Sequence, residues 1–273
     1  MLKLDQQLVE NVLKIAYQAG EHIKSFYANS VEIHIKADNT PVTDADIFVS
    51  KFVSQALQEL TPNIPILSEE CCKIPLSERK DWEEYWIIDP LDGTQQFINR
   101  TDQFSVVIAL VQKNVPVLGV IHAPIFDKTY YAYDQHGAFL IENEQTLRLS
   151  NHGKSLSETN RLHVTIGTSQ CPQVKKAVRA HYDVEFIKYG SSSLKAGLVA
   201  EGKADCYIRF GDTGEWDTAA AEILLNESGG EIFNLNFEPL SYNQRETFVN
   251  PYFMMVSNKD LDWKQIFSFD EFY

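Results

Sequence analysis

The chain has 273 residues, and its 24 basic and 38 acidic side chains give it a net charge of −14. A charge this negative disfavours nucleic acid as a partner, because nucleic-acid binding needs clustered lysine and arginine. Hydrophobic residues make up 44% of the chain, which is enough for a large core in one large domain or in two of ordinary size.

The cysteines and the lengths of the apolar runs indicate where in the cell the protein is located. Cys71, Cys72, Cys171 and Cys206 show no C-x-x-C spacing, so neither a disulfide framework nor a zinc site is predicted and reduced thiols are expected. The first ten residues lack the apolar core of a signal peptide, and the longest apolar runs are strand-sized rather than membrane-sized. We therefore expect a cytoplasmic protein without an integral membrane segment. A peripheral position on the inner membrane face, and a monomer or a homodimer, remain open.

The first half is predicted to pack two helices against a largely antiparallel sheet. Apolar residues at helical spacing predict helices over residues 4–27 and 44–60. Between them we expect a strand with one buried face over residues 31–35, with His34 on the solvated side, and a loop over residues 37–46. Further strands are expected over residues 65–67, 86–89, 104–111, 115–123, 129–133, 137–141 and 147–149, with an exposed, charged excursion over residues 71–84.

The second half changes pattern. Residues 151–160 are polar and mark a predicted boundary between an N-terminal α+β subdomain (residues 1–150) and a C-terminal α/β subdomain (residues 151–273). Beyond the boundary strands and helices alternate, so the whole chain is predicted to be a layered α+β or α/β protein. Strands are expected over residues 164–167, 186–189, 206–210 and 253–256, and helices over residues 172–182, 193–200 and 217–227.

The stretch W-I-I-D-P-L-D-G-T-Q-Q-F-I-N-R, residues 86–100, has the strongest chemical signal. An apolar strand ends at Asp89, and Pro90 should stop it because proline lacks the backbone donor. Asp92 follows, Gly93 allows a sharp turn, and Thr94 is placed to cap a short helix. Two carboxylates, the carbonyl between them and amides suited to a phosphate are the ligands that Mg²⁺ prefers. The motif alone is also compatible with an ordinary surface turn.

Two further carboxylates stand at the ends of predicted elements. Glu69 follows the short strand over residues 65–67, and Asp217 begins the helix over residues 217–227. Taken alone, Glu69 could be a solvated loop acid and Asp217 a helix cap. If both converge on Asp89 and Asp92, the four carboxylates would hold two or more Mg²⁺ ions.

The motifs D-P-L-D-G-T, S-E-E and W-D-T-A-A resemble the signatures of the inositol monophosphatase superfamily of Mg²⁺-dependent, Li⁺-sensitive phosphatases. The segments T-P-V-T-D-A-D (40–46), G-S-S-S-L-K-A-G-L-V-A-E-G (190–202), Y-I-R-F-G (207–211) and R-E-T-F-V-N-P (245–251) are similar to its 3′(2′),5′-bisphosphate nucleotidase branch. This resemblance runs from about residue 36 to residue 251 and implies the layered αβαβα sandwich of sugar phosphatases. Ala196 and Gly197 depart from it, since a larger side chain often follows the lysine of S-S-L-K.

The resemblance implies a role for each matching residue. Asp46 would polarise a water together with Thr94, and Lys195 and Arg209 would contact the nucleotide, although alone they read as a surface lysine and an edge-strand arginine. The implied catalytic residues are Glu69, Thr94 and Asp46; the implied metal ligands are Glu69, Asp89, the Leu91 carbonyl, Asp92 and Asp217, around two or three Mg²⁺ ions. The implied substrate contacts are Glu69, Leu91, Asp92, Gly93, Thr94, Ser192, Lys195, Arg209 and Asp217.

The implied reaction is hydrolysis of the 3′-phosphate of 3′-phosphoadenosine 5′-phosphate to AMP and phosphate, with the 5′-phosphosulfate analogue as a second substrate. Three alternatives stay open. The same metal site would serve a phosphatase of inositol or other sugar phosphates. An enzyme that forms an aspartyl phosphate is disfavoured, because it typically has a D-x-D spacing. A non-catalytic regulator that binds Mg²⁺ and nucleotide would need to have lost a catalytic group, and none of the implied groups is missing.

Overall fold

The computed structural model describes residues 1–29, 32–36, 40–151, 160–167 and 170–272. The larger sheet has seven strands in the order β3-β4-β5-β6-β7-β8-β9. Every neighbouring pair is antiparallel except β3 with β4, which confirms the largely antiparallel sheet expected for the first half. Its strands are β3 (Ile66–Ser68), β4 (Glu84–Asp92), β5 (Ser105–Gln112), β6 (Val115–Ala123), β7 (Lys128–Tyr133), β8 (Gly137–Glu142) and β9 (Gln145–Leu149).

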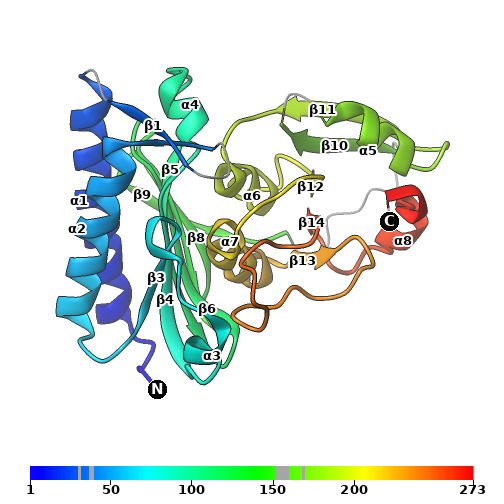
Figure 1. Cartoon of the computed structure of the whole chain (residues 1–273). Coiled ribbons are helices and arrows are strands. Elements are labelled where there is room, and N and C mark those ends of the chain that lie inside the picture. Colours follow the sequence, from blue (N-terminus) through cyan, green and yellow to red (C-terminus); the bar gives the residue numbers. More distant parts are fainter. Residues whose placement is uncertain (30–31, 37–39, 152–159, 168–169, 273) are drawn as a thin grey trace.

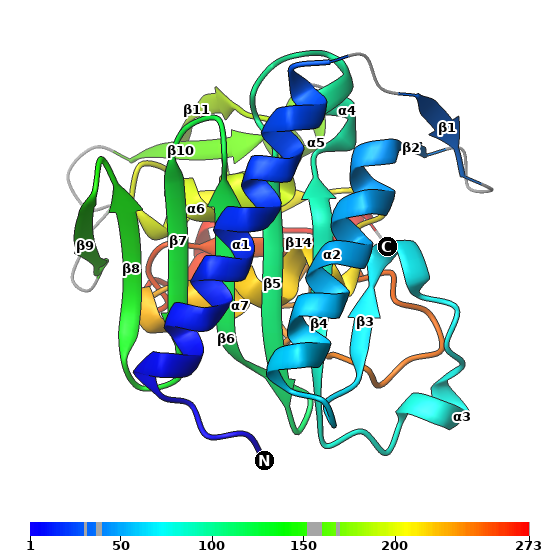
Figure 2. The same cartoon turned by 90° about the vertical axis from the view of Figure 1, so that its left-hand side faces the viewer.

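Two helices, α1 (Gln6–Tyr27) and α2 (Asp44–Leu60), cover one face of this sheet (Figure 2). Asp5 is the N-cap of α1, and its side chain accepts a hydrogen bond from the Leu8 amide at 3.0 Å. Strand β4 is buried on both faces. Trp86 and Ile88 pack in the core under these helices, whereas Tyr85 and Ile87, which alternate with them, belong to the core on the other side. A strand covered on both faces needs a continuous apolar run, which is the pattern that residues 85–88 show.

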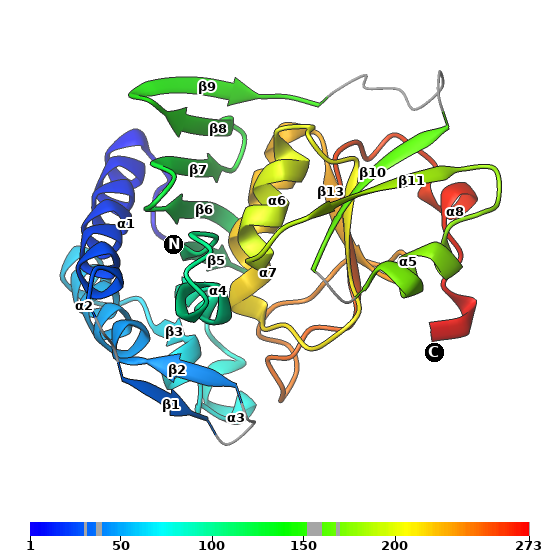
Figure 3. The ribbon, with the colours of Figure 1, turned by 90° about the horizontal axis from the view of Figure 1, so that it is seen from above.

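The smaller sheet has five strands in the order β11-β10-β12-β14-β13. The strands β11, β10 and β12 run parallel, and β14 and β13 continue antiparallel. Helices α5 (Cys171–Ala177) and α8 (Trp263–Ile266) lie on its outer side (Figure 3). Its strands are β10 (Arg161–Ile166), β11 (Asp183–Lys188), β12 (Cys206–Arg209), β13 (Glu231–Asn234) and β14 (Phe253–Val256).

Helices α6 (Ser192–Ala200) and α7 (Glu215–Ser228) lie between the two sheets (Figures 1 and 3). The layers therefore run helix, sheet, helix, sheet, helix, which is the predicted αβαβα sandwich. Helix α7 approaches β6 closely at Gly119, where a Cβ atom would lie 2.7 Å from the Cα atom of Ala220. Only glycine permits this approach, and it brings the start of α7 toward the end of β4.

The prediction that Pro90 ends its strand is wrong. Strand β4 continues through Pro90 to Asp92, and its pairing with β5 shifts between Asp89 and Asp92. Three residue steps on β4 oppose two on β5 there, which is a bulge with one extra residue. A bulge tolerates the missing proline donor, and the pairing of β4 with β3 has already ended at Ile88.

The prediction of a buried strand face over residues 31–35 is wrong over Ile33–Ile35, and residue 31 lies outside the described residues. Strand β1 (Ile33–Ile35) forms, but it pairs only with β2 (Pro41–Thr43), and Ile33 and Ile35 are 50% and 65% exposed. This two-stranded arm lies beside the start of α2 (Figure 2), with β2 packed against the protein and β1 on its exposed side. The expected loop over residues 37–46 is wrong over Pro41–Thr43 and the first turn of α2, and residues 37–39 lie outside the described residues.

Three other local predictions need correction. The excursion over residues 71–84 contains a short helix, α3 (Leu76–Arg79), and Arg79 is fully buried. The helix expected over residues 172–182 ends at Ala177, because Val178 turns into an isolated bridge with Phe267. Strand β13 and helix α8 were not predicted, since both have only four residues.

Two expectations concern the whole chain. Most of the predicted boundary, residues 152–159, lies outside the described residues, so the division at residue 150 stays a prediction. One core cluster draws side chains from both proposed subdomains, including Val107 of β5 and Tyr207 of β12. The four cysteines are free. No helix within the described ranges is long and apolar enough to cross a membrane.

Candidate functional site

Three aspartates converge where β4 meets α7. Asp89 and Asp92 come from the bulged end of β4, and Asp217 from the first turn of α7. One carboxylate oxygen from each lies within 4.8 Å of the others. We call Asp89, Asp92 and Asp217 the carboxylate cluster. It brings together three of the carboxylates that the sequence predicts as metal ligands.

Local structure holds the cluster in place. Asp217 caps its own helix, because its Oδ2 accepts a hydrogen bond from the Gly214 amide at 2.8 Å. Asp89 Oδ1 accepts from the Leu91 amide at 2.9 Å, across the bulge. The predictions that Asp217 begins this helix and is its N-cap are wrong, because α7 begins at Glu215 with Gly214 as the N-cap. Asp217 is the third helical residue, and its bond back to Gly214 does not exclude a place in the cluster.

The electrostatics of the cluster favour a cation. Burial, with repulsion from Glu69, Asp92 and Asp217, raises the pKa of Asp89 well above its usual range. Burial, with repulsion from Asp92 and Glu69, does the same for the pKa of Asp217. Such carboxylates are unfavourable as anions unless a positive charge joins them. The oxygen donors present therefore fit a hard divalent cation such as Mg²⁺.

Glu69 lies beside the cluster rather than within it. It begins the short 3₁₀ helix η1 (Glu69–Cys71), directly after β3. Lys36 Nζ lies 2.8 Å from Glu69 Oε1 and 2.8 Å from Glu70 Oε1. Although burial alone would lower it, the two carboxylates raise the pKa of Lys36. The sequence prediction missed Lys36, whose only signal is its place just before the T-P-V-T-D-A-D segment.

Thr94 and Asp46 form a direct pair, as the resemblance implies. Thr94 Oγ1 donates to Asp46 Oδ1 at 2.8 Å and lies 3.3 Å from the Leu91 carbonyl oxygen. Asp46 Oδ2 accepts from the backbone amide of Thr43 at 2.7 Å. Burial raises the pKa of Asp46, and these hydrogen bonds oppose the rise. Asp46 is thus held on one oxygen by its own helix start and on the other by Thr94.

The expected cap at Thr94 is wrong by one residue. Gly93 is the N-cap of α4 (Thr94–Ile98), with a φ of 99° in the left-handed region. A Cβ atom at Gly93 would lie 2.9 Å from the Gln103 carbonyl oxygen. Glycine therefore satisfies both the turn and the close packing.

A cavity of about 550 Å³ adjoins the cluster. It is lined by residues from the end of β4, the start of α7, the loop before α6 and β12. The cavity brings together six of the predicted site residues: Asp92, Gly93, Ser192, Lys195, Arg209 and Asp217. It also has lining residues that the sequence did not single out, among them Gln96, Gln103, Gln170, Lys188 and Tyr189.

Lys195 is not the surface lysine that its local sequence would allow. It is 4% exposed, and its Nζ donates to the carbonyl oxygens of Ser191 at 2.6 Å and Tyr189 at 3.3 Å. It also lies 4.9 Å from the centre of the Tyr207 ring. Burial lowers the pKa of Lys195 to about 8. Since an ammonium has three donors, one remains for a ligand in the cavity.

Arg209 lies on β12, between β10 and β14, so it is not an edge-strand arginine. Its Nε donates to Thr213 Oγ1 at 2.9 Å and its Nη2 to the Asp212 carbonyl at 2.9 Å. These bonds fix the guanidinium and leave donors free toward the cavity.

Ala196 and Gly197, which depart from the family pattern, do not shape the cavity. Ala196 is fully buried and a Cβ at Gly197 would meet the Tyr130 ring, so this departure concerns core packing.

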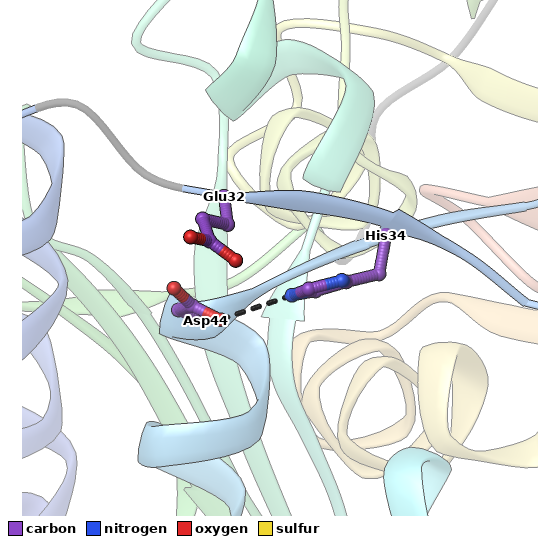
Figure 4. Close-up of side chains that lie close together, drawn as sticks. All are labelled: Glu32, His34 and Asp44. Atoms are coloured by element: carbon purple, nitrogen blue, oxygen red, sulfur yellow. Dashed lines mark hydrogen bonds and ion pairs between the residues drawn. The ribbon is translucent and has the colours of Figure 1, made fainter.

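A second group of potential ligands lies on the β1–β2 arm. The carboxylates of Glu32 and Asp44 lie close together on one side of the His34 ring, and His34 Nε2 lies 3.2 Å from Asp44 Oδ1 (Figure 4). Glu32 and His34 are exposed, which agrees with the prediction of a solvated His34. Exposed acidic groups of this kind are common without an ion, and we assign the group no function.

Comparisons with known proteins agree with this site. The model of the inositol monophosphatase family matches residues 5–263. The 3′(2′),5′-bisphosphate nucleotidase CysQ of Haemophilus influenzae (strain ATCC 51907 / DSM 11121 / KW20 / Rd) is 54% identical over 99% of this chain and 100% of its own. The CysQ of Escherichia coli (strain K12) is 36% identical over 90% of this chain and 98% of its own.

Solved structures give the same answer for the fold. The crystal structure of CysQ from Bacteroides thetaiotaomicron, described as a bacterial member of the inositol monophosphatase family, superposes with a TM-score of 0.74 at 34% identity and covers 93% of this chain and 98% of that one. The extragenic suppressor protein SuhB of Bartonella henselae has a TM-score of 0.76 at 24% identity, over 95% and 97% of the two chains, and supports the fold alone. The chain therefore belongs to the inositol monophosphatase family.

Proposed function

We propose that the protein is a Mg²⁺-dependent 3′(2′),5′-bisphosphate nucleotidase, which hydrolyses the 3′-phosphate of 3′-phosphoadenosine 5′-phosphate to AMP and phosphate. One observation carries the proposal. A single cavity has carboxylates of the cluster at one end and Lys188, Lys195 and Arg209 in its walls. A substrate with two phosphates needs both features, because only one phosphate can occupy the metal site. The relatives that are 54% identical are named for this activity, which supports the same assignment.

The proposed metal ligands are Asp89, Asp92, Asp217, the Leu91 carbonyl and Glu69, around two or three Mg²⁺ ions. The donor chemistry supports this set, since all are hard oxygen ligands and burial with mutual repulsion raises the pKa of Asp89 and of Asp217. When bound, such ions would supply Lewis acidity and a nucleophilic water. Glu69 is paired with Lys36 and is the proposed ligand from the η1 side.

We assign the handling of the water proton to Thr94 and Asp46. Because the Thr94 hydroxyl gives its hydrogen to Asp46, the lone pairs of its oxygen can accept a hydrogen from the attacking water and orient it. Asp46 is buried and has a raised pKa, so it is suited to take up a proton through Thr94. The Gly93 amide and Thr94 are proposed to hold the phosphate that is cleaved.

Ser192, Lys195 and Arg209 are proposed to hold the nucleotide and the phosphate that is not cleaved. Both cations are fixed by hydrogen bonds and keep free donors, so they can bind a phosphate without first becoming ordered. The 5′-phosphosulfate analogue carries anionic oxygens at the same place and is proposed as a second substrate. We place the enzyme in the cytoplasm, where its free cysteines would stay reduced.

The test is phosphate release from 3′-phosphoadenosine 5′-phosphate and from inositol 1-phosphate, each with and without Mg²⁺. We expect release to require Mg²⁺ and kcat/KM to be about 10- to 100-fold higher for the nucleotide, because a charge-assisted bond contributes roughly 1.5–3 kcal/mol. Equal or better use of inositol 1-phosphate would refute the substrate assignment. Trapping of a phosphorylated carboxylate would refute direct attack by water.

A further inference from the structure

The loop that precedes α6 grips one member of the carboxylate cluster. The Ser192 amide donates to Asp92 Oδ1 at 3.1 Å, and the Ser193 amide donates to Asp92 Oδ2 at 2.8 Å. The hydroxyls of Ser191 and Ser193 both donate to Asp92 Oδ2 as well. We call residues 191–193 the serine cradle. Its four donors come from a different layer of the fold than Asp92, which lies at the end of β4 in the larger sheet.

The hydrogen bonds of the cradle have a defined direction. Ser193 has one hydroxyl hydrogen and gives it to Asp92, so Ser105, whose Oγ lies 2.7 Å from Ser193 Oγ, must donate to Ser193. Ser191 gives its hydrogen to Asp92 and accepts from the Leu194 amide at 3.1 Å. Ser105 and Ser193 are fully buried and Ser191 is 5% exposed, so water does not compete for these bonds. Every hydroxyl therefore points its hydrogen toward the carboxylate.

This pattern leaves the two oxygens of Asp92 unequal. A carboxylate offers about four lone-pair sites, roughly two on each oxygen. Three donors crowd Oδ2, whereas Oδ1 has a single long bond to the Ser192 amide. We propose that Ser191 and Ser193 are positioning residues, which hold the Asp92 carboxylate turned so that Oδ1 is the oxygen presented to the metal ion. This inference rests on the proposed metal site.

The backbone of Ser191 supports the proposal independently. Its φ is 54°, in the left-handed region that side chains other than glycine rarely adopt. Such a conformation persists only where the surroundings impose it, and it is found preferentially at functional sites. Glycine would fit this backbone without strain but would lack the hydroxyl that binds Asp92. The serine thus gives up backbone stability for its bond to the carboxylate.

The test measures Mn²⁺ binding to the full-length protein without substrate. Binding is monitored in a titration as the decrease of the EPR signal of free Mn²⁺. The variants are Ser193→Ala and Ser191→Gly, and the control is Ser228→Ala. Ser228 is equally buried, and its hydroxyl bonds only the Leu225 carbonyl, at 3.0 Å, roughly 16 Å along α7 from Asp217. We expect Ser193→Ala and Ser191→Gly to weaken Mn²⁺ binding about 10- to 100-fold, and the control to leave it unchanged.

Ser191→Gly separates positioning from a purely structural role. It relieves backbone strain, so the melting temperature of the metal-free variant should equal or exceed that of the wild type while its Mn²⁺ affinity falls. Wild-type affinity in both cradle variants would overturn the inference alone. Failure of the wild type to bind Mn²⁺ would overturn the metal site, and the inference with it.

Discussion

Replacement of the buried Arg79 by methionine should destabilise the protein by about 3–5 kcal/mol, as when one partner of a buried charged network is removed. Arg79 is fully buried, and its Nη1 donates to Asn243 Oδ1 at 2.7 Å. Its other donors bond three backbone carbonyls, those of Ile74, Arg245 and Glu246, at 2.7–3.0 Å. Methionine fills similar space but leaves all four acceptors without this donor. Each acceptor that water cannot reach costs roughly 1–3 kcal/mol.

Loss of the Arg79 hydrogen bonds should also disturb the position of Asp217 in the carboxylate cluster. The Asn243 amide donates to Glu215 Oε2 at 2.9 Å, and the Phe248 carbonyl accepts from the Glu215 amide at 2.9 Å. Glu215 is in the first turn of α7, two residues before Asp217. We therefore expect Arg79→Met to lower kcat under conditions where the variant remains folded. The motif R-E-T-F-V-N-P thus anchors the start of α7.

Urea unfolding at neutral pH measures the stability change. The matched control is Arg161→Met, because the side chain of Arg161 is 58% exposed and is paired with the equally exposed Glu185 carboxylate at 3.6 Å. An exposed pair of this kind contributes at most about 1 kcal/mol. A loss for Arg79→Met no larger than that of the control would refute the reasoning.

Three other predictions follow. Burial lowers the pKa of His122 to about 4. Because the same side chain has a pKa near 6.5 in the unfolded chain, the unfolded state takes up a proton first as the pH falls. The stabilisation from neutral His122 is therefore complete above pH 6.5 and is lost progressively toward pH 4. Relative to His122→Gln, the wild type should lose about 2 kcal/mol of unfolding free energy between pH 7 and pH 5, and parallel urea-derived curves would contradict this. Asp92→Asn should abolish turnover while the circular dichroism spectrum is retained, and a near-normal rate at saturating Mg²⁺ would argue against a metal role. Lys195→Met should raise KM for 3′-phosphoadenosine 5′-phosphate about 10- to 100-fold but leave kcat/KM for adenosine 3′-phosphate unchanged, whereas equal losses on both would show that Lys195 does not bind the 5′-phosphate.

Local patterns were sufficient where an element is regular. The short, largely apolar runs over residues 115–123 and 253–256 gave the bounds of β6 and β14 that the structure has, because a buried strand is a stretch of consecutive residues. The positions of Asp89, Asp92 and Asp217 were also informative, since each was expected where one element ends or begins and side chains from separate segments can meet. The structure moves those ends only slightly, with β4 running on to Asp92 and α7 beginning at Glu215.

Features that depend on distant partners could not be predicted in this way. Arg79 looks like one charge in a charged segment, and only the packing of residues 243–248 against it explains its burial. The pairing of Lys36 with Glu69 joins residues that are 33 positions apart. The contact of Ser193 with Asp92 spans 101 positions, and nothing in the local composition of either segment encodes the direction of the hydroxyl hydrogens.

The bulge in β4 explains why a metal motif can have two acids three positions apart on one strand. Side chains three steps apart on a regular strand point to opposite faces of the sheet, so Asp89 and Asp92 could not meet. One extra residue reverses the parity, and both carboxylates join the carboxylate cluster. A deletion of Pro90 would restore regular pairing, keep both acids on one face as D-x-D and remove the kink that turns the strand into Gly93. The odd spacing is therefore a geometric requirement of this strand end, and it separates the site from those built on two acids of a straight strand.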